Sequence, residues 1–168
     1  GLPSDEILSR FEDAVAYIAE HREINNVLLS GGDPMMLSTR ALSFMLESLS
    51  RIHHLDFIRI GTRTPVVVPE RIIEDAELRA LFRRYSRPDR RLYVVTQFNH
   101  PREITDRSTA AVDSLIRCGV IVSNQAVLLR GVNDDPGVLA ELQSRLVGMG
   151  AMPYYVFQCR PVKRATAG

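Results

Sequence analysis

Residues 28–34 of the chain read Leu28-Leu29-Ser30-Gly31-Gly32-Asp33-Pro34. An apolar run that begins at Asn26 stops at the two glycines, and a helical pattern starts near Ser38. This order predicts a buried strand, residues 26–30, that delivers a loop of bare backbone to the surface. Glycine has no Cβ and adopts positive φ, so the N–H and C=O groups of such a loop can approach a ligand closely.

Asp33 admits two interpretations. Its carboxylate could receive an ammonium group of a ligand. It could equally be the N-cap of the following helix, with Pro34 in the first helical position, which would make the segment a plain strand-to-helix turn. Short glycine motifs recur by chance, so this segment alone leaves both interpretations open.

The composition is that of an ordinary globular protein. The chain has 168 residues, 45% of them hydrophobic and 24% charged, which suffices for a single domain, 1–168, with a sizeable core. Lys and Arg number 21 against 20 Asp and Glu, a net charge of +1 that gives no support for nucleic-acid or membrane-surface partners. No apolar run approaches the roughly 20 residues that span a bilayer, and without a signal-peptide pattern we expect a cytoplasmic protein.

Neither the cysteines nor the arginine clusters indicate a site. Cys118 and Cys159 lie far apart and no CxxC spacing occurs, so no metal-ligating residue is predicted and Cys118 is expected to be a small buried hydrophobe. The arginines around the turn at residues 88–89 are expected to form a solvated face: Arg83, Arg84, Arg87, Arg90 and Arg91.

Helical and strand patterns alternate along the chain. Helices are expected near 4–18, 38–51, 69–82, 105–118 and 136–148, and strands at 26–30, 57–61, 92–96, 120–122 and 153–158. The fourth strand is expected to break at residues 123–125 and to continue as an apolar run, 126–129. Short strands that are apolar nearly throughout indicate a parallel sheet covered by helices. The pattern alone fits a (β/α) barrel and an open doubly wound sheet about equally well.

Polar side chains follow the predicted strands. In parallel α/β folds the carboxyl ends of the strands share one face, so these residues are expected to converge there. Arg63 could instead pair with a surface carboxylate, and Asn99 and His100 could simply form a rigid turn. A buried amide needs hydrogen-bond partners, so a purely structural role is less expected for the two amides in the fourth strand. The set is Ser30, Gly31, Gly32, Asp33, Thr62, Arg63, Gln97, Asn99, His100, Asn124, Gln125 and Gln158.

This set favours recognition over acid–base chemistry. It lacks a Ser-His-Asp arrangement, a close carboxylate pair and a phosphate-binding loop, and no nucleophile stands out. We therefore predict no catalytic residue in this chain. Amides, one carboxylate, one guanidinium and one imidazole suit a zwitterionic, nucleoside-like molecule.

These loops, in this order, resemble the lysine 2,3-aminomutase family of radical S-adenosylmethionine (SAM) enzymes. The resemblance implies a partial (β/α) barrel with parallel strands and outer helices. It also implies the family's chemistry: a [4Fe–4S] cluster cleaves SAM to a 5′-deoxyadenosyl radical, which abstracts hydrogen from an amino acid held on pyridoxal phosphate (PLP), and the amino group migrates to the neighbouring carbon. The matching segments extend over most of residues 26–162: VLLSGGDP, IRIGTRTPVVVPERI, QFNHPREIT, NQAVLLRGVNDDP and PYYVFQCRPV.

The same resemblance assigns residues to ligands. The loop Ser30-Gly31-Gly32-Asp33 corresponds to the one that holds the amino group of SAM, and a carboxylate beside free backbone groups suits an ammonium ion. Further positions resemble SAM contacts or their neighbours: Arg63, Asn99, His100, Asn124 and Gln125. Tyr154 and Gln158 would lie on the side of PLP and of the small amino-acid substrate.

The chain departs from the family in several places. The cluster motif CxxxCxxC and the PLP-binding lysine are absent from residues 1–168, so their ligands lie outside this chain. We therefore expect an internal fragment of a longer enzyme, inactive alone, which lacks the first barrel strand and the C-terminal region. The missing strand would leave an unpaired sheet edge, which favours association of copies into a homo-oligomer.

Two departures concern the substrate. Gln97 stands where the family commonly has His before Phe-Asn-His-Pro. Arg160 stands where lysine-specific members have an Asp that receives the side-chain ammonium of the substrate. A cation there would repel lysine and favour an acidic or neutral substrate.

Other functions are open on the sequence alone. A radical SAM enzyme of related fold could act on a lysine of elongation factor P. A degenerate barrel could bind SAM or a nucleotide without catalysis. A phosphate-binding barrel enzyme is a weaker alternative, because the chain lacks the glycine-rich phosphate loop usual late in such barrels.

Overall fold

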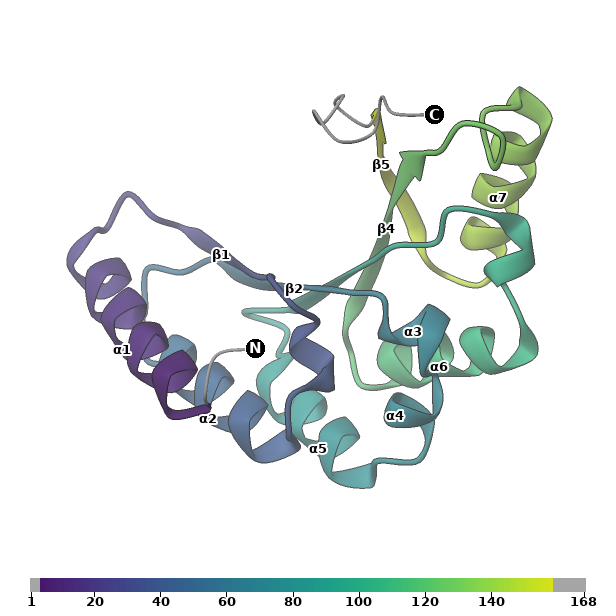
Figure 1. Ribbon diagram of the computed structural model, residues 1–168. Coiled ribbons are helices and arrows are strands. Elements are labelled where there is room, and N and C mark those ends of the chain that lie inside the picture. The colour runs from purple at the N-terminus through teal and green to yellow at the C-terminus, as the bar shows by residue number, and fades with distance from the viewer. Residues whose placement is uncertain (1–3, 159–168) are drawn as a thin grey trace.

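The computed structural model describes residues 4–158 (Figure 1). Helices and strands alternate along the chain, as the sequence predicts, with two short 3₁₀ helices, η1 and η2, after the first and third strands. In order, the elements are α1 (Ser4–Glu20), β1 (Asn26–Leu29), η1 (Pro34–Met36), α2 (Thr39–Ser50), β2 (Phe57–Thr62), α3 (Thr64–Val67), α4 (Glu70–Ile73), α5 (Ala76–Tyr85), β3 (Leu92–Thr96), η2 (Pro101–Glu103), α6 (Asp106–Arg117), β4 (Ile121–Leu128), α7 (Pro136–Gly148) and β5 (Met152–Gln158).

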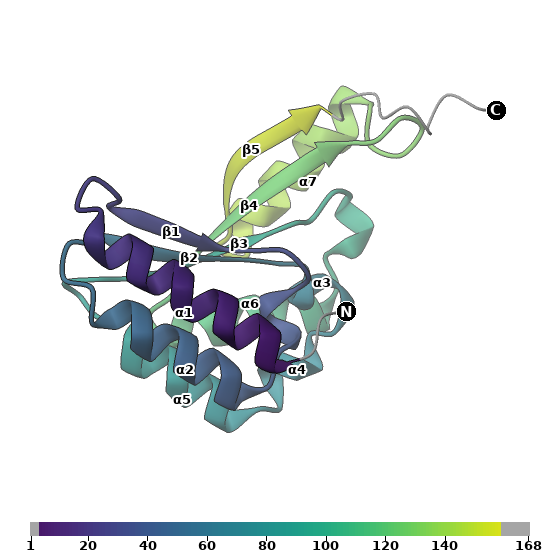
Figure 2. The ribbon, with the colours of Figure 1, turned by 60° about the vertical axis from the view of Figure 1, so that its left-hand side comes forward.

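The five strands form one parallel sheet in the order β1-β2-β3-β4-β5. Each strand pairs with the next one in sequence, so the strand order never reverses as it does in a doubly wound sheet. The sheet curves, and β4 and β5 rise out of the plane of β1–β3, while the helices cover its outer side (Figures 1 and 2). The expected partial (β/α) barrel is confirmed; the sheet is not closed.

The core lies between the sheet and the helices. In β2 the exposure alternates residue by residue, with Ile58 and Ile60 buried on the helix side. All four α2 residues that the pattern places inward are buried, namely Leu42, Met45, Leu46 and Leu49. Cys118 is 3% exposed, as expected of a small buried hydrophobe, and this burial raises the pKa of its thiol.

Two expected elements differ from the structure. The helix predicted for residues 69–82 is interrupted after Ile73, because Asp75 caps a new helix by accepting the Leu78 N–H at 2.8 Å. The break predicted at residues 123–125 appears as an irregularity within one strand. β4 is continuous from Ile121 to Leu128, because a hydrogen-bonded amide can be buried within a strand, but its pairing with β5 shifts register between Asn124 and Gln125.

The outer edges of β1 and β5 have no strand partner within residues 4–158. Side chains on β5 are largely exposed, including Tyr155 at 54% and Phe157 at 47%. Association of copies through these edges stays a prediction.

Candidate functional site

The structure bears out one of the two interpretations of Asp33, that of an N-cap. One carboxylate oxygen accepts the Met35 N–H at 3.0 Å, which caps η1, and the Thr62 hydroxyl at 2.6 Å. The other oxygen accepts the Arg63 N–H at 2.7 Å. The N-cap role is thus confirmed, and the second oxygen retains a lone pair for a ligand donor.

The two glycines before Asp33 have positive φ, 87° for Gly31 and 58° for Gly32. A Cβ built on either would meet no atom within 4 Å. The backbone conformation therefore requires glycine, and the space above the loop is open.

A hollow of about 480 Å³ lies on the concave face of the sheet, at the carboxyl ends of the strands. It brings together eight members of the predicted set, which come from β1, β2, β3 and β4 or from the loops after them: Ser30, Gly31, Gly32, Asp33, Thr62, Arg63, Gln97 and Gln125. The convergence expected from the strand ends is therefore present for this group.

Glu103 links the loop after β2 to the loop after β3. One oxygen of its carboxylate accepts a hydrogen bond from the Arg63 guanidinium at 2.8 Å. The other oxygen accepts hydrogen bonds from the backbone N–H groups of Asn99 at 2.5 Å and His100 at 3.2 Å. Sequence reasoning missed Glu103. The available signal was the spacing of a capping box, since His100 caps η2 and Glu103 is its third residue.

His100 does not line the hollow. Its Nδ1 accepts the backbone N–H of Arg102 at 3.1 Å, so the imidazole caps η2. The backbone N–H of His100 and the guanidinium of Arg63 both donate to the carboxylate of Glu103, so the two residues share one partner. A direct contact between His100 and a ligand stays a prediction.

Asn99 and Asn124 are almost fully buried, at 5% and 2% exposure, and neither lines the hollow. The Asn124 amide accepts the Phe98 N–H at 2.7 Å and donates to the Phe98 carbonyl at 3.0 Å. The Asn99 side chain accepts the Val127 N–H at 2.8 Å. Both amides hold loop backbone in place, the role that seemed less expected for Asn124.

Asn133, which sequence reasoning also missed, extends this framework to the loop after β4. Its amide donates to the carbonyls of Asn99 at 2.7 Å and Val127 at 2.8 Å, and it accepts the Leu129 N–H at 2.7 Å. Loops after four strands are therefore joined by hydrogen bonds through side chains.

No family model matches the chain. It is 44% identical over 151 residues to a putative L-lysine 2,3-aminomutase of Aquifex aeolicus, covering 90% of this chain and 40% of the relative. It is 42% identical to the L-lysine 2,3-aminomutase of Clostridium subterminale and 40% identical to the glutamate 2,3-aminomutase of Clostridioides difficile, each match covering 90% of this chain and 35% of the relative.

Over about 90% of its own length, the chain is similar to part of the 2,3-aminomutases. It spans about two fifths or less of the length of these curated relatives. Relatives named for lysine and for glutamate match it almost equally well, so overall identity does not distinguish between the two substrates.

The last two predicted site residues, Tyr154 and Gln158, lie on β5. Tyr154 is 55% exposed and lines a small hollow beside α7, and Gln158 pairs with Leu128 at the end of the sheet. Neither lines the hollow at the glycine loop. Arg160 and Cys159 lie outside the described residues.

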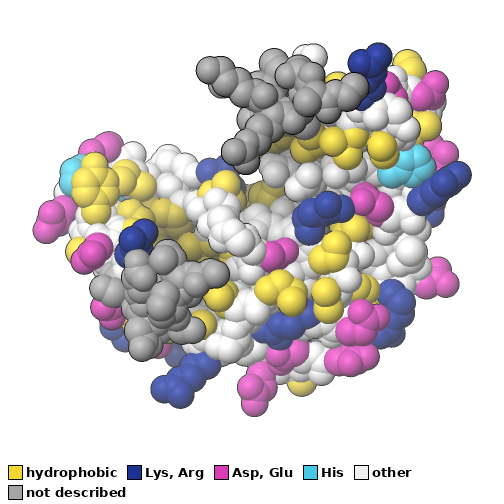
Figure 3. All heavy atoms as spheres, in the orientation of Figure 1, with side chains coloured by type: hydrophobic (Ala, Val, Ile, Leu, Met, Phe, Trp, Pro, Cys, Tyr) yellow, Lys and Arg dark blue, Asp and Glu magenta, His cyan; other side chains and the backbone are white. Residues whose placement is uncertain are grey.

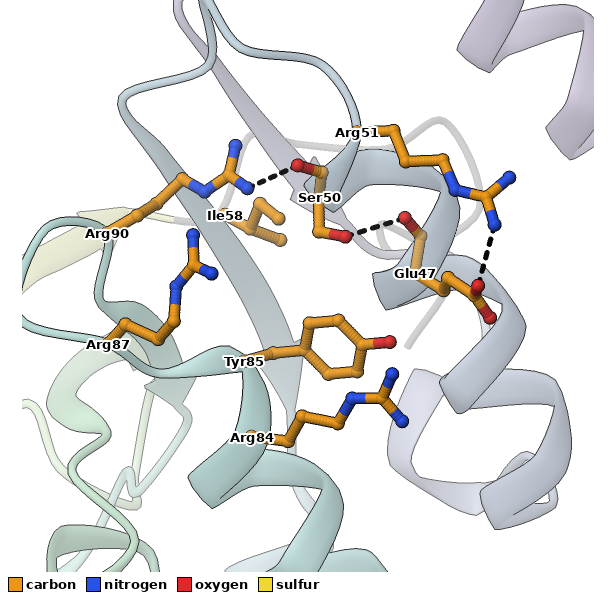
Figure 4. Close-up of a pocket in the computed structure, with 8 residues that line it drawn as sticks. All are labelled: Glu47, Ser50, Arg51, Ile58, Arg84, Tyr85, Arg87 and Arg90. Atoms are coloured by element: carbon orange, nitrogen blue, oxygen red, sulfur yellow. Dashed lines mark hydrogen bonds and ion pairs between the residues drawn. The ribbon is translucent and has the colours of Figure 1, made fainter.

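Another hollow, of about 260 Å³, lies at the opposite ends of the strands (Figure 4). Arg90 donates there to the carbonyls of Ser50 at 2.5 Å and Ile52 at 3.0 Å, and so covers the end of α2. Arg51 pairs with Glu47 at 2.7 Å. Cations at a helix C-terminus are stabilising, so these arginines have structural roles.

The residues at the glycine loop fit the ligand that the resemblance implies. The Arg63 Nε is buried without a hydrogen-bond partner, and the open space over the glycines leaves backbone groups accessible. Within the part of the chain that the structure describes, no three His, Cys, Asp or Glu side chains gather to hold a metal ion. Among the same residues, no helix is both long and apolar enough to cross a membrane.

Proposed function

We propose that this chain is the SAM-binding part of an amino-acid 2,3-aminomutase of the radical SAM type. One observation carries the proposal: the hollow over the loop Ser30-Gly31-Gly32-Asp33, in a chain similar to 2,3-aminomutases over 90% of its length. In the complete enzyme, SAM and a [4Fe–4S] cluster would supply a 5′-deoxyadenosyl radical and PLP would hold the amino acid. The cluster ligands and the PLP lysine would come from outside residues 1–168.

The residues around the hollow would divide the recognition of SAM among them. The glycine backbone and the free lone pair of Asp33 would hold the methionine ammonium group. Arg63 would reach the methionine carboxylate, since guanidinium groups bind carboxylates by two parallel hydrogen bonds. Gln97 and Gln125 would offer amides to the nucleoside.

Direct binding of SAM tests the proposal. Calorimetry on the full-length protein should show binding that Asp33→Ala weakens at least tenfold, while Asp89→Ala, on an exposed turn, leaves it unchanged. Loss of the η1 cap is checked separately by thermal unfolding. SAM affinity equal in the wild type and in a folded Asp33→Ala variant would refute this site.

The substrate is proposed as an acidic or neutral amino acid rather than lysine. Arg160 would repel an ammonium group at the end of the substrate and attract a carboxylate. Reconstituted full-length enzyme should turn over L-glutamate faster than L-lysine, and Arg160→Asp should reverse that preference. Activity only on intact elongation factor P would favour the related isomerase, and SAM binding without turnover would favour a non-catalytic barrel.

A further inference from the structure

Arg59 is the only charged residue among the described residues of the five strands. It lies in β2 between Ile58 and Ile60, which are buried against the helices. Because successive side chains in a strand point to opposite faces, Arg59 lies on the concave face of the sheet, the face that carries the glycine-loop hollow.

The position of Arg59 relates it to that hollow. Its register partner in β1 is Leu28, and Gly61 lies two residues further along β2. Both Leu28 and Gly61 line the hollow. Two residues of a strand extend roughly 6–7 Å, so Arg59 lies one layer deeper on the same face.

The guanidinium of Arg59 is only partly satisfied. One terminal nitrogen donates to the Asn26 side-chain oxygen at 2.6 Å, and the group lies 5.8 Å from the centroid of the Phe57 ring. Its Nε is buried without a hydrogen-bond partner. No carboxylate among the side chains that the structure describes pairs with it, although a guanidinium carries five N–H donors.

These contacts orient a cation without neutralising it. Asn26 and Phe57 fix the plane of the guanidinium, so little conformational freedom remains to be lost when an anion binds. A buried N–H without a hydrogen-bond partner is rare in folded proteins, so the Nε of Arg59 is available to donate to a ligand.

We propose that Arg59 binds an oxyanion of the second ligand of this enzyme, either the phosphate of PLP or the carboxylate of the amino-acid substrate. The inference rests on the proposed function. It would place this ligand on the concave face, next to the hollow proposed for SAM.

The test uses the full-length protein with Arg59→Gln, which removes the charge, and Arg59→Lys, which keeps it. Arg117→Gln is the matched control, because that arginine forms an exposed pair with Asp113 on α6. Thermal unfolding establishes that each variant is folded. Three quantities are then measured: SAM affinity by calorimetry, the affinities for PLP and for pyridoxal by absorbance, and the KM for the amino acid.

If Arg59 holds the phosphate, Arg59→Gln lowers the affinity for PLP at least tenfold but leaves the affinity for pyridoxal unchanged. The protein then no longer binds PLP more tightly than pyridoxal. If it holds the carboxylate, PLP affinity is unchanged and the KM rises at least tenfold, with a smaller change in kcat. Either result supports the inference, and Arg59→Lys should recover part of the loss.

Two outcomes would overturn it and can be told apart. A wild-type protein that binds neither SAM nor PLP refutes the proposed function and this inference together. A wild-type protein that binds both, with Arg59→Gln indistinguishable from Arg117→Gln in every measurement, refutes the role of Arg59 alone.

Discussion

The carboxylate of Glu103 accepts a hydrogen bond from the guanidinium of Arg63 at 2.8 Å, across 40 residues of sequence. The other oxygen of Glu103 holds the backbone of the next loop. A side chain outside the hollow therefore fixes Arg63, the one cation among the described residues that line it.

Replacing Glu103 by Ala should lower the free energy of unfolding by about 1–3 kcal/mol, because two backbone N–H groups lose their acceptor. SAM binding should weaken several-fold, since Arg63 loses its orientation. Urea unfolding and calorimetry measure the two effects. Glu47→Ala, which removes an exposed ion pair, should change stability by no more than about 0.5 kcal/mol. Unchanged SAM affinity in Glu103→Ala would leave Glu103 a purely structural residue.

The neighbours Asn124 and Gln125 should respond in opposite ways to replacement by alanine. Asn124→Ala leaves the Phe98 backbone groups buried and unpaired, so it should cost about 2–4 kcal/mol of stability. Gln125→Ala should cost little stability but weaken SAM binding, because Gln125 lines the hollow. Chemical unfolding and calorimetry on both variants check this, and a SAM affinity insensitive to Gln125→Ala would contradict it.

Gly32→Ala should destabilise the chain by about 1–2 kcal/mol, because Gly32 has a φ of 58° while its Cβ would meet no neighbour. The added methyl group would enter the open space over the loop, so SAM affinity should fall at least tenfold. Gly148→Ala provides the contrast: Gly148 lies in α7 without positive φ, and alanine there should stabilise by about 0.5–1 kcal/mol. Equal effects of the two substitutions on SAM binding would argue against the ligand position.

Asp75 should make stability depend on pH in the acid range. Burial alone would raise the pKa of its carboxyl group, but hydrogen bonds from Leu78, Thr39 and Arg71 outweigh it and the pKa is lowered. Because the pKa is lower in the folded state, the ionised carboxylate contributes stability at pH values above its unfolded-state pKa of about 3.9. That contribution is lost as the pH falls through the folded-state pKa. Unfolding followed between pH 5 and 2 should show the loss, and Asp75→Asn should reduce the slope. An identical slope in that variant would assign the dependence to other carboxylates.

The parallel α/β sheet and the glycine loop could be predicted from the sequence because both depend on local pattern, whereas the choice of a partial barrel rested on the family resemblance. Alternating apolar runs define the parallel strands, and paired glycines mark the loop whose positive φ the structure confirms. Glu103 and Asn133 were missed because their roles arise from backbone groups far away in sequence. Asn124 was misjudged for the same reason: its partners are in the loop after the neighbouring strand, and no pattern in β4 reveals them.

The hydrogen bonds that Asp33, Glu103 and Asn133 make between loops should also affect how these loops move. Because they couple the rim of the sheet from β1 to β4, the four loops should open to solvent together rather than one at a time. A ligand bound only at the loop after β1 would then also slow the exchange of amide protons in the loop after β4. The four loops would respond to the ligand as one rigid unit.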